Sequence, residues 1–253
     1  MSAAWRRLLE EIGRARDAGR AADFWWRDDD AARPDPALER LIALAQASQV
    51  PLALAAIPAL AEPAAFARLP AGVAILQHGS DHRNRAAPGE KKSEFPDADP
   101  PAAAIARLAE ARRRLAGVVG ERLLPVLAPP WNRIPATHVA PLADAGFRGL
   151  SCYGPRRAAA AAPGLVQVNT HVDLVAWRTG RGFAGEDAVL AGAAAHLAAK
   201  REARADPAEA TGWLSHHAVH DDAAWRFLER LFETLRAVPG VRWLGAQELF
   251  RLS

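Results

Sequence analysis

The chain has 253 residues, half of them hydrophobic, which is enough for one well-filled domain and does not demand a second. Its 32 lysine and arginine residues barely exceed its 29 acidic residues, so the formal net charge of +3 argues against a nucleic-acid-binding protein. The single cysteine, Cys152, excludes an intrachain disulfide and a thiolate metal cluster.

The first twenty residues indicate a helix rather than a targeting segment. Trp5, Leu8 and Ile12 recur at helical spacing among arginine and glutamate, which predicts an N-terminal helix within residues 1–20. The segment lacks the uninterrupted apolar core of a secretory signal. No apolar run in the chain approaches the roughly 20 residues that span a bilayer. We therefore expect no membrane span and a cytoplasmic protein.

Short apolar runs then alternate with helical patterns, which is typical of repeated β-α units around a largely parallel sheet. We expect a single α/β domain over residues 1–253, built as a distorted (β/α) barrel with about seven parallel strands. The expected strands are 23–27, 52–57, 73–76, 124–127, 146–150, 165–168 and 212–215, with 241–244 as an eighth. The expected helices are 36–47, 101–117, 186–205 and 221–238.

Polar clusters follow several of these strands. In a parallel α/β barrel, the residues just beyond the carboxyl ends of the strands form the active-site face, so clusters that are distant in sequence can converge there. The one long irregular stretch, residues 79–100, contains several prolines and mixed charges. Loops of this length in compact domains are usually functional or disordered, and we expect this one to cover the substrate site.

The run from Trp25 to Asp30 places three consecutive carboxylates directly after an apolar strand. Their mutual repulsion favours a bound cation or proton at that strand end. His78 and His82, four residues apart, can supply the remaining ligands of a cation. One carboxylate with two neutral imidazoles leaves a coordination position open for water, which is typical of a catalytic metal site. The pattern therefore predicts a metal-dependent hydrolase.

The order of these motifs resembles the polysaccharide deacetylases, also called the NodB-homology or carbohydrate esterase 4 family, whose members hydrolyse N-acetyl groups on amino sugars. The family's first motif reads Thr-Phe-Asp-Asp-Gly, and Trp26 to Asp30 stand in the same frame. The resemblance then implies that Asp28 is the general base and Asp29 a metal ligand. The second motif, His-Ser/Thr-x-x-His, matches His78 and His82 as the other two ligands.

The third motif departs from the family pattern. It normally reads Arg-x-Pro-Tyr, but Ala128 stands where the family's arginine contacts the catalytic aspartate. Arg27 or Arg133 can take the place of that arginine. The aromatic position holds Trp131, and the resemblance implies that its backbone N–H binds the oxyanion.

The fourth and fifth motifs supply the acid. The fourth, Asp-x-x-Asp-Trp, keeps Asp173 and Trp177 but has Ala176 in place of the aspartate that orients the catalytic histidine, so Asp173 is the nearest replacement. The fifth motif, Leu-x-His, matches His216, with His217 directly behind it. Because successive strand residues point to opposite faces, only one of the two histidines can enter the site, and we expect His216.

The chemistry that these residues permit agrees with the resemblance. A divalent ion held by Asp29, His78 and His82 would acidify a bound water, and Asp28 would accept its proton. Protonated His216 would donate to the departing amine, which leaves as a free amine beside acetate. Zinc is the default ion for these ligands, although cobalt, nickel or manganese also suits them.

Some residues have simpler interpretations. Asp30 is expected only to precede the helix that starts near Pro36. His196 is expected to be a surface or satisfied core residue. His171 with Asp173 is a candidate for binding either a second metal or the first one.

Two other functions stay open. The chain can be a metal-dependent hydrolase of a non-sugar amide on the same fold, because loops set the substrate of such barrels. It can also be a non-catalytic carbohydrate-binding relative that has lost the arginine and the aspartate of the altered motifs. The absence of an export signal favours a soluble intracellular N-acetylated glycan, a sugar precursor or a glycoconjugate as the substrate. The sequence leaves the sugar, the native metal and the oligomeric state open.

Overall fold

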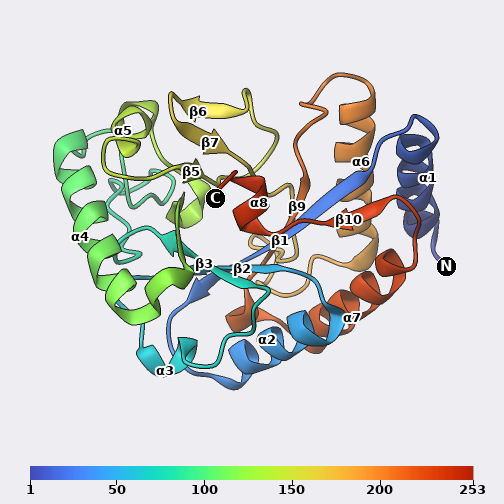
Figure 1. Ribbon diagram of the computed structural model, residues 1–253, viewed down its shortest axis with the longest axis horizontal. Coiled ribbons are helices and arrows are strands. Elements are labelled where there is room, and N and C mark those ends of the chain that lie inside the picture. The colour runs from blue at the N-terminus through green and yellow to red at the C-terminus, as the bar shows by residue number, and fades with distance from the viewer. Residues whose placement is uncertain (253) are drawn as a thin grey trace.

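The computed structural model describes residues 1–252, which form a single domain with one mostly parallel sheet (Figure 1). The strand order is β6-β7-β5-β4-β3-β2-β1-β9-β8, and β10 also pairs with β1. Pairing between these strands is parallel except between β6 and β7. The strands are β1 (Ala22–Ala31), β2 (Leu52–Ala56), β3 (Val73–His78), β4 (Leu123–Ala128), β5 (Gly149–Leu150), β6 (Ala160–Ala162), β7 (Leu165–Gln167), β8 (Val172–Asp173), β9 (Thr211–Ser215) and β10 (Val241–Trp243).

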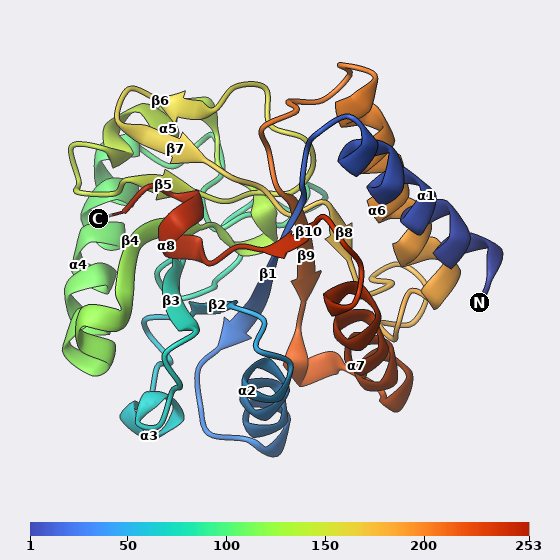
Figure 2. The ribbon, with the colours of Figure 1, turned by 45° about the vertical axis from the view of Figure 1, so that its right-hand side comes forward.

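Residues 165–173 link the two ends of this sheet. β7 pairs with β5, and β8, a few residues later, pairs with β9. Between these strands, Val168 donates its N–H to the carbonyl of Leu150, and His171 donates its N–H to the carbonyl of Gly212. One stretch of chain is therefore bonded first to one end of the sheet and then to the other, and the sheet curls (Figure 2).

Helices surround the strands in both views (Figures 1 and 2). They are α1 (Ala3–Asp17), α2 (Pro36–Ser48), α3 (Pro63–Phe66), α4 (Pro101–Val119), α5 (Ala136–Val139), α6 (Glu186–Arg201), α7 (Asp222–Arg236) and α8 (Ala246–Leu249). Four single turns of 3₁₀ helix cover 120–122, 130–132, 140–142 and 217–219. Helix α1 packs on α6, α2 packs on α7, and α4 packs on β3 and β4.

Alternation along β1 separates two apolar layers. Phe24 and Trp26 belong to the large cluster beneath the outer helices, whereas Trp25 belongs to a second cluster with residues of β2, β3 and β4. Phe250, which directly follows α8, meets Trp25 edge-on at a centroid distance of 6.2 Å. A Cβ at Gly149 would lie 2.4 Å from the Phe250 ring, so this close approach requires glycine.

Helix α7 shows how the outer layer is held. Asp221 caps it by accepting the N–H of Ala224 at 2.8 Å. Leu228, Leu231 and Leu235 recur at helical spacing and are fully buried. Each buried leucine of this kind stabilises the fold by roughly 1.5–3 kcal/mol before conformational entropy is counted.

The predicted α/β domain with a largely parallel sheet is confirmed. All eight predicted strands are present, although β5 is shorter than expected. The short strands β6 and β8 were not predicted, because two or three residues are too few to show a period. Residues 79–100 contain neither helix nor strand, as expected for the long loop. Within residues 1–252, every helix is too short or too polar to cross a membrane.

Candidate metal centre

The three carboxylates at the end of β1 point in different directions. Arg27 and Asp29 are two residues apart and share one face of the strand, while Asp28 lies on the other face. Asp30 has a φ angle of 74°, in the left-handed region that aspartate tolerates better than most residues, and the pairing of β1 with β2 shifts register just past Asp28. This turn takes Asp30 out of the alternation and brings its carboxylate to the histidines at the end of β3.

Asp30, His78 and His82 form the candidate metal centre. Oδ1 of Asp30 lies 3.2 Å from Nε2 of His78 and 3.2 Å from Nε2 of His82. Nδ1 of His78 lies 2.9 Å from the carbonyl oxygen of Ala128, so Nδ1 carries the hydrogen and Nε2 presents a lone pair. Oδ1 of Asp30 is buried and has no hydrogen-bond partner among residues 1–252. The sequence-based assignment gave this ligand position to Asp29, and the structure favours Asp30 instead.

The three donor atoms fit a divalent cation. A carboxylate oxygen and an imidazole lone pair repel each other at this distance unless a proton or a cation lies between them. In tetrahedral zinc sites with metal–ligand distances near 2.0–2.1 Å, ligand atoms lie roughly 3.3 Å apart, close to the separations of 3.2 Å at Asp30. Burial opposes ionisation of Asp30, but the neighbouring imidazoles of His78 and His82 outweigh it and hold the pKa of Asp30 far below its usual value. The ionised form is the one that binds a cation.

Residues 79–100 fix the position of His82 through Glu94. Glu94 is fully buried and accepts the N–H of Ser80 at 2.7 Å and the N–H of His82 at 3.1 Å. Gly79 has a φ angle of 64°, and a Cβ there would lie 2.2 Å from Oε2 of Glu94, so the turn requires glycine. Glu94 was not predicted, because its role depends on a fold-back of the loop that carries no periodic signal.

Asp29 is held by Arg27 rather than by the histidines. Nε and Nη2 of Arg27 donate to the two oxygens of Asp29 at 2.8 and 2.9 Å, and both side chains are buried. Arg27 also donates to the side chain of Asn132 at 2.6 Å. Arg133, the other arginine considered for this role, donates to the carbonyl of Lys92 at 2.7 Å instead. Of the two arginines, Arg27 is therefore the one that contacts an aspartate of β1.

Asp28 lies in a separate buried network behind the centre. Its Oδ2 accepts the hydroxyl of Ser215 at 2.6 Å and the backbone N–H of His217 at 3.0 Å, and its Oδ1 accepts Nδ1–H of the same histidine. Burial opposes ionisation of Asp28, but His217 outweighs it and holds the pKa of Asp28 below its usual value. In return Asp28 raises the pKa of His217 against the effect of burial. This arrangement does not favour Asp28 as the base that meets substrate.

His216 faces away from that network. Its Nδ1 lies 3.9 Å from Oδ1 of Asp173, and the Trp177 ring meets the His216 ring edge-on at 4.7 Å. Trp177 donates its indole N–H to Oδ2 of Asp173 at 2.8 Å. Burial raises the pKa of Asp173 above its usual value. The two histidines that follow β9 thus point to different places, and His216 is the one beside Asp173.

One pocket of about 980 Å³ collects most of the predicted residues. Its lining includes Asp29, Asp30, His78, His82, Trp131, Arg133, Asp173, Trp177 and His216. Asp28, Arg27 and His217, which were also predicted, lie behind its wall. Tyr153, which was not predicted, lines the pocket and is 48% exposed. The ring of Trp131 lies 4.6 Å from the ring of His82.

No protein-family model and no curated protein matches the chain. Solved structures do match it. A protein described as a probable polysaccharide deacetylase from Pseudomonas aeruginosa PAO1 has a TM-score of 0.63 and 15% identity, with 92% of this chain and 91% of that chain covered. The chain has the polysaccharide-deacetylase fold.

Two further structures have the same deacetylase fold. The family 4 carbohydrate esterase from Streptomyces lividans has a TM-score of 0.55 and 16% identity, with 87% of this chain and 90% of that chain covered. The chitin deacetylase from Colletotrichum lindemuthianum has a TM-score of 0.54 and 16% identity, with 91% and 88% covered. The chain therefore spans nearly the whole length of these deacetylase-fold domains.

A second group of ligand-type residues lies at the opposite edge of the deacetylase-type sheet. His171 precedes β8, Glu209 precedes β9, and His196 lies on α6; their donor atoms lie within 4.8 Å of one another. Nε2 of His171 is 3.3 Å from Oε2 of Glu209. Because Nδ1 of His171 accepts the N–H of Gly212 at 3.0 Å, the ring hydrogen is on Nε2, facing the carboxylate. His171 was considered as a ligand together with Asp173, but its Nε2 faces Glu209 instead.

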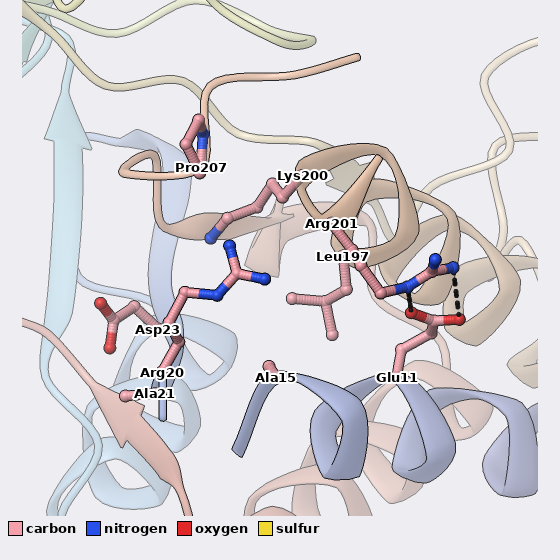
Figure 3. A pocket seen from close by; sticks show the side chains of 9 residues that line it. All are labelled: Glu11, Ala15, Arg20, Ala21, Asp23, Leu197, Lys200, Arg201 and Pro207. Atoms are coloured by element: carbon pink, nitrogen blue, oxygen red, sulfur yellow. Dashed lines mark hydrogen bonds and ion pairs between the residues drawn. The ribbon is translucent and has the colours of Figure 1, made fainter. Parts of the chain in front are cut away.

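A smaller pocket of about 220 Å³ lies between α1 and α6 (Figure 3). Glu11 on its wall is paired with Arg201 at 3.0 Å, and Asp23 is paired with Arg242 at 2.7 Å. Burial lowers the pKa of Lys200, which extends into this pocket. Both acids are already neutralised by arginines, and no histidine lines the pocket within residues 1–252. It lacks the histidine and carboxylate combination of the candidate metal centre.

Proposed function

We propose that the protein is a metal-dependent hydrolase that removes N-acetyl groups from an amino-sugar-containing glycan or glycoconjugate. One observation carries the proposal: a three-donor cation site, an arginine-held aspartate and an aspartate-flanked histidine line the same pocket. The deacetylase fold supports it, because neighbours with this fold are described as deacetylases, and one is described in complex with acetate.

In this proposal Asp30, His78 and His82 hold the cation. The first family motif then reads one residue later than the sequence alignment suggested, with Asp29-Asp30 as the Asp-Asp pair and Asp28 in the aromatic position. The hydrogen-bond pattern favours this frame. Only Asp30 lies beside the imidazoles, and only Asp29 receives the arginine that the family uses to hold its catalytic aspartate.

Asp29 is the proposed general base. It lines the pocket, and Arg27 stabilises its ionised form with two charge-assisted hydrogen bonds. A divalent cation in the centre would polarise the amide carbonyl and make a nearby water more acidic. Asp29 accepts the proton that this water loses as it attacks the carbonyl carbon.

His216 is the proposed general acid. The amine leaving group is too basic to depart unprotonated, so a donor must reach its nitrogen. His216 lines the same pocket, and the carboxylate of Asp173 stabilises the protonated imidazole from 3.9 Å. The backbone N–H of Trp131, on the wall beside His82, is the proposed contact to the oxyanion. The carbon–nitrogen bond breaks, and the products are acetate and a free amine.

Two isosteric variants test the assignment of the base. Asp29→Asn removes the proton acceptor, and we expect acetate release from N-acetylated sugar oligomers to fall by roughly 10²- to 10⁴-fold while the bound cation is retained. Asp28→Asn is the matched control one residue earlier and is expected to lower the rate much less. If Asp28→Asn is inactive and Asp29→Asn is active, the original alignment, with Asp28 as the general base, is correct instead. A protein that binds no divalent ion after dialysis against zinc would overturn the hydrolase proposal.

A further inference from the structure

The mouth of the pocket is strongly basic. Four exposed side chains on its wall carry positive charge: Lys92, Arg133, Arg178 and Arg181. Its three carboxylates lie deeper and are each engaged: Asp29 with Arg27, Asp30 with the two histidines, and Asp173 with the indole of Trp177. The outer part of the pocket therefore has positive charge without acidic neighbours.

None of the four cations has an internal counter-ion. Within residues 1–252, no carboxylate oxygen lies within 4.0 Å of any of them, whereas Arg85 is paired with Asp81 at 2.8 Å and Arg242 with Asp23 at 2.7 Å. The hydrogen bond from Arg133 to the carbonyl of Lys92 also holds two cationic residues of different loops together. Like charges that are gathered without compensation attract an anionic ligand.

Aromatic surface accompanies the charge. Tyr153 and Trp177, 48% and 41% exposed, are two of the four large hydrophobic side chains that are exposed in residues 1–252, and both line this pocket. The guanidinium of Arg181 lies 5.9 Å from the centre of the Trp177 ring. Two exposed aromatic side chains within one pocket favour a ligand-binding site there, and they share this pocket with the four cations, which together form its basic rim.

We propose that the substrate is an acetamido sugar that carries an anionic group, a phosphate or a carboxylate, and that the basic rim binds this group. This inference rests on the proposed function. Arginine and lysine at the rim match the oxygens of either anion. The anionic group takes no part in the hydrolysis. It holds the sugar so that the acetamide reaches the floor, where Asp29 and His216 lie.

Three related sugars provide the test: N-acetylglucosamine, its 1-phosphate, and N-acetylmuramic acid, which carries a carboxylate. We expect kcat/KM for acetate release to be about tenfold higher for one or both anionic sugars at low ionic strength. The preference should shrink toward parity near 1 M salt, where the screening length is roughly 3 Å. A phosphate-only or a carboxylate-only preference would identify the anion. Equal kcat/KM for all three sugars would overturn the inference while leaving the proposed function intact.

Variants of the rim show where the preference arises. The double variant Arg178→Gln/Arg181→Gln and the single variant Lys92→Gln should lower the ratio of anionic to neutral kcat/KM by about fivefold and about twofold. Arg181→Lys keeps the charge and should keep most of the ratio. Arg157→Gln is the control, because Arg157 is also exposed and lies outside the pocket. A ratio that is unchanged in the double variant, or equally reduced in Arg157→Gln, would contradict the assignment.

Binding measured without turnover separates this inference from the proposed function. Calorimetry with the Asp29→Asn variant should give a lower Kd for an anionic sugar than for N-acetylglucosamine. If the wild-type protein releases no acetate from any sugar but this difference in Kd is present, the proposed function fails and the anionic ligand class stands. If neither anionic sugar binds more tightly than the neutral one, the inference fails whatever the activity.

Discussion

Two clusters in this molecule contain the same residue types, two histidines and one carboxylate whose donor atoms lie within 4.8 Å of one another. They lie at opposite ends of the strands. In the candidate metal centre, His78 donates its Nδ1–H to a carbonyl, and its free Nε2 faces Asp30. In the other cluster, His171 accepts a backbone N–H at Nδ1, so its Nε2 carries the hydrogen and faces Glu209. Nε2 of His78 is therefore free to bind a cation, whereas Nε2 of His171 carries a hydrogen and is not.

Solvent access separates the two clusters further. The side chains of Asp30 and His82 are 33% and 25% exposed and open into the large pocket, whereas Glu209 is fully buried and the side chain of His171 is 2% exposed. The first cluster lies at the carboxyl ends of the strands, where active sites lie in parallel barrels. The second lies near their amino ends, where residues usually serve stability. Residue types alone do not make a metal site, because proton positions and access decide whether a lone pair is free.

Removing one imidazole from each cluster gives the largest expected difference. His78→Ala leaves two donors in the metal centre, so we expect the metal content to fall from about one ion per chain to near zero and acetate release to fall by at least about 10²-fold. His196→Ala should keep the ion. Elemental analysis of both variants, purified side by side, measures this. Loss of the ion in His196→Ala would show that the second cluster also binds metal.

Breaking the second cluster should instead lower stability. Glu209 accepts the backbone N–H groups of Asn169 at 3.2 Å and Arg156 at 3.0 Å, and it faces Nε2–H of His171. Glu209→Gln places an amide NH₂ among these donors, so we expect the free energy of unfolding to fall by about 2–3 kcal/mol. Urea unfolding of metal-free protein measures the change. A loss below about 0.5 kcal/mol would mean that the carboxylate does not hold these segments.

Much of this fold could be predicted from the sequence, because apolar runs and helical spacing are local signals. The residues that gather in the pocket were also largely predicted, since Asp, His and Trp stand at motif spacings after strands. Their roles at β1 were harder to predict. The choice between Asp29 and Asp30 depends on the left-handed backbone of Asp30 and the register shift beside it, and neither leaves a mark in the pattern of residue types.

Partners that are distant in sequence were the least predictable part. Glu94 supports His82 from a loop without periodicity, and Glu209 meets His171 across 37 intervening residues. Charged residues of this kind usually lie on the surface, so burial of a carboxylate is evident only when the fold supplies its donors. Arg27 is an intermediate case, because its position two residues before Asp29 on one strand places both side chains on the same face.

The pH dependence of stability sharpens the comparison at His196. Burial, followed by the charges of His171 and Lys200, lowers the pKa of His196 to about 2, against roughly 6.5 in an unfolded chain. Below about pH 6.5 the unfolded chain takes up a proton that the folded chain does not, so this contribution to stability is lost as pH falls. His196→Gln should reduce the loss between about pH 6.5 and 4.5 by about 1–2 kcal/mol in urea unfolding. Parallel curves for wild type and variant would contradict a neutral buried imidazole.

The smallest expected effect comes from Thr211→Val, a nearly isosteric change at the first residue of β9. Thr211 is fully buried, and its hydroxyl lies 2.9 Å from Nδ1 of His196, whose Nε2 has no hydrogen-bond partner among residues 1–252. The variant leaves that imidazole without a polar partner, so we expect a loss of about 1 kcal/mol in urea unfolding. Metal content and acetate release should not change, because His216 follows the other end of the same strand. A change in either one would mean that the two clusters, at opposite ends of the strands, are coupled through β9.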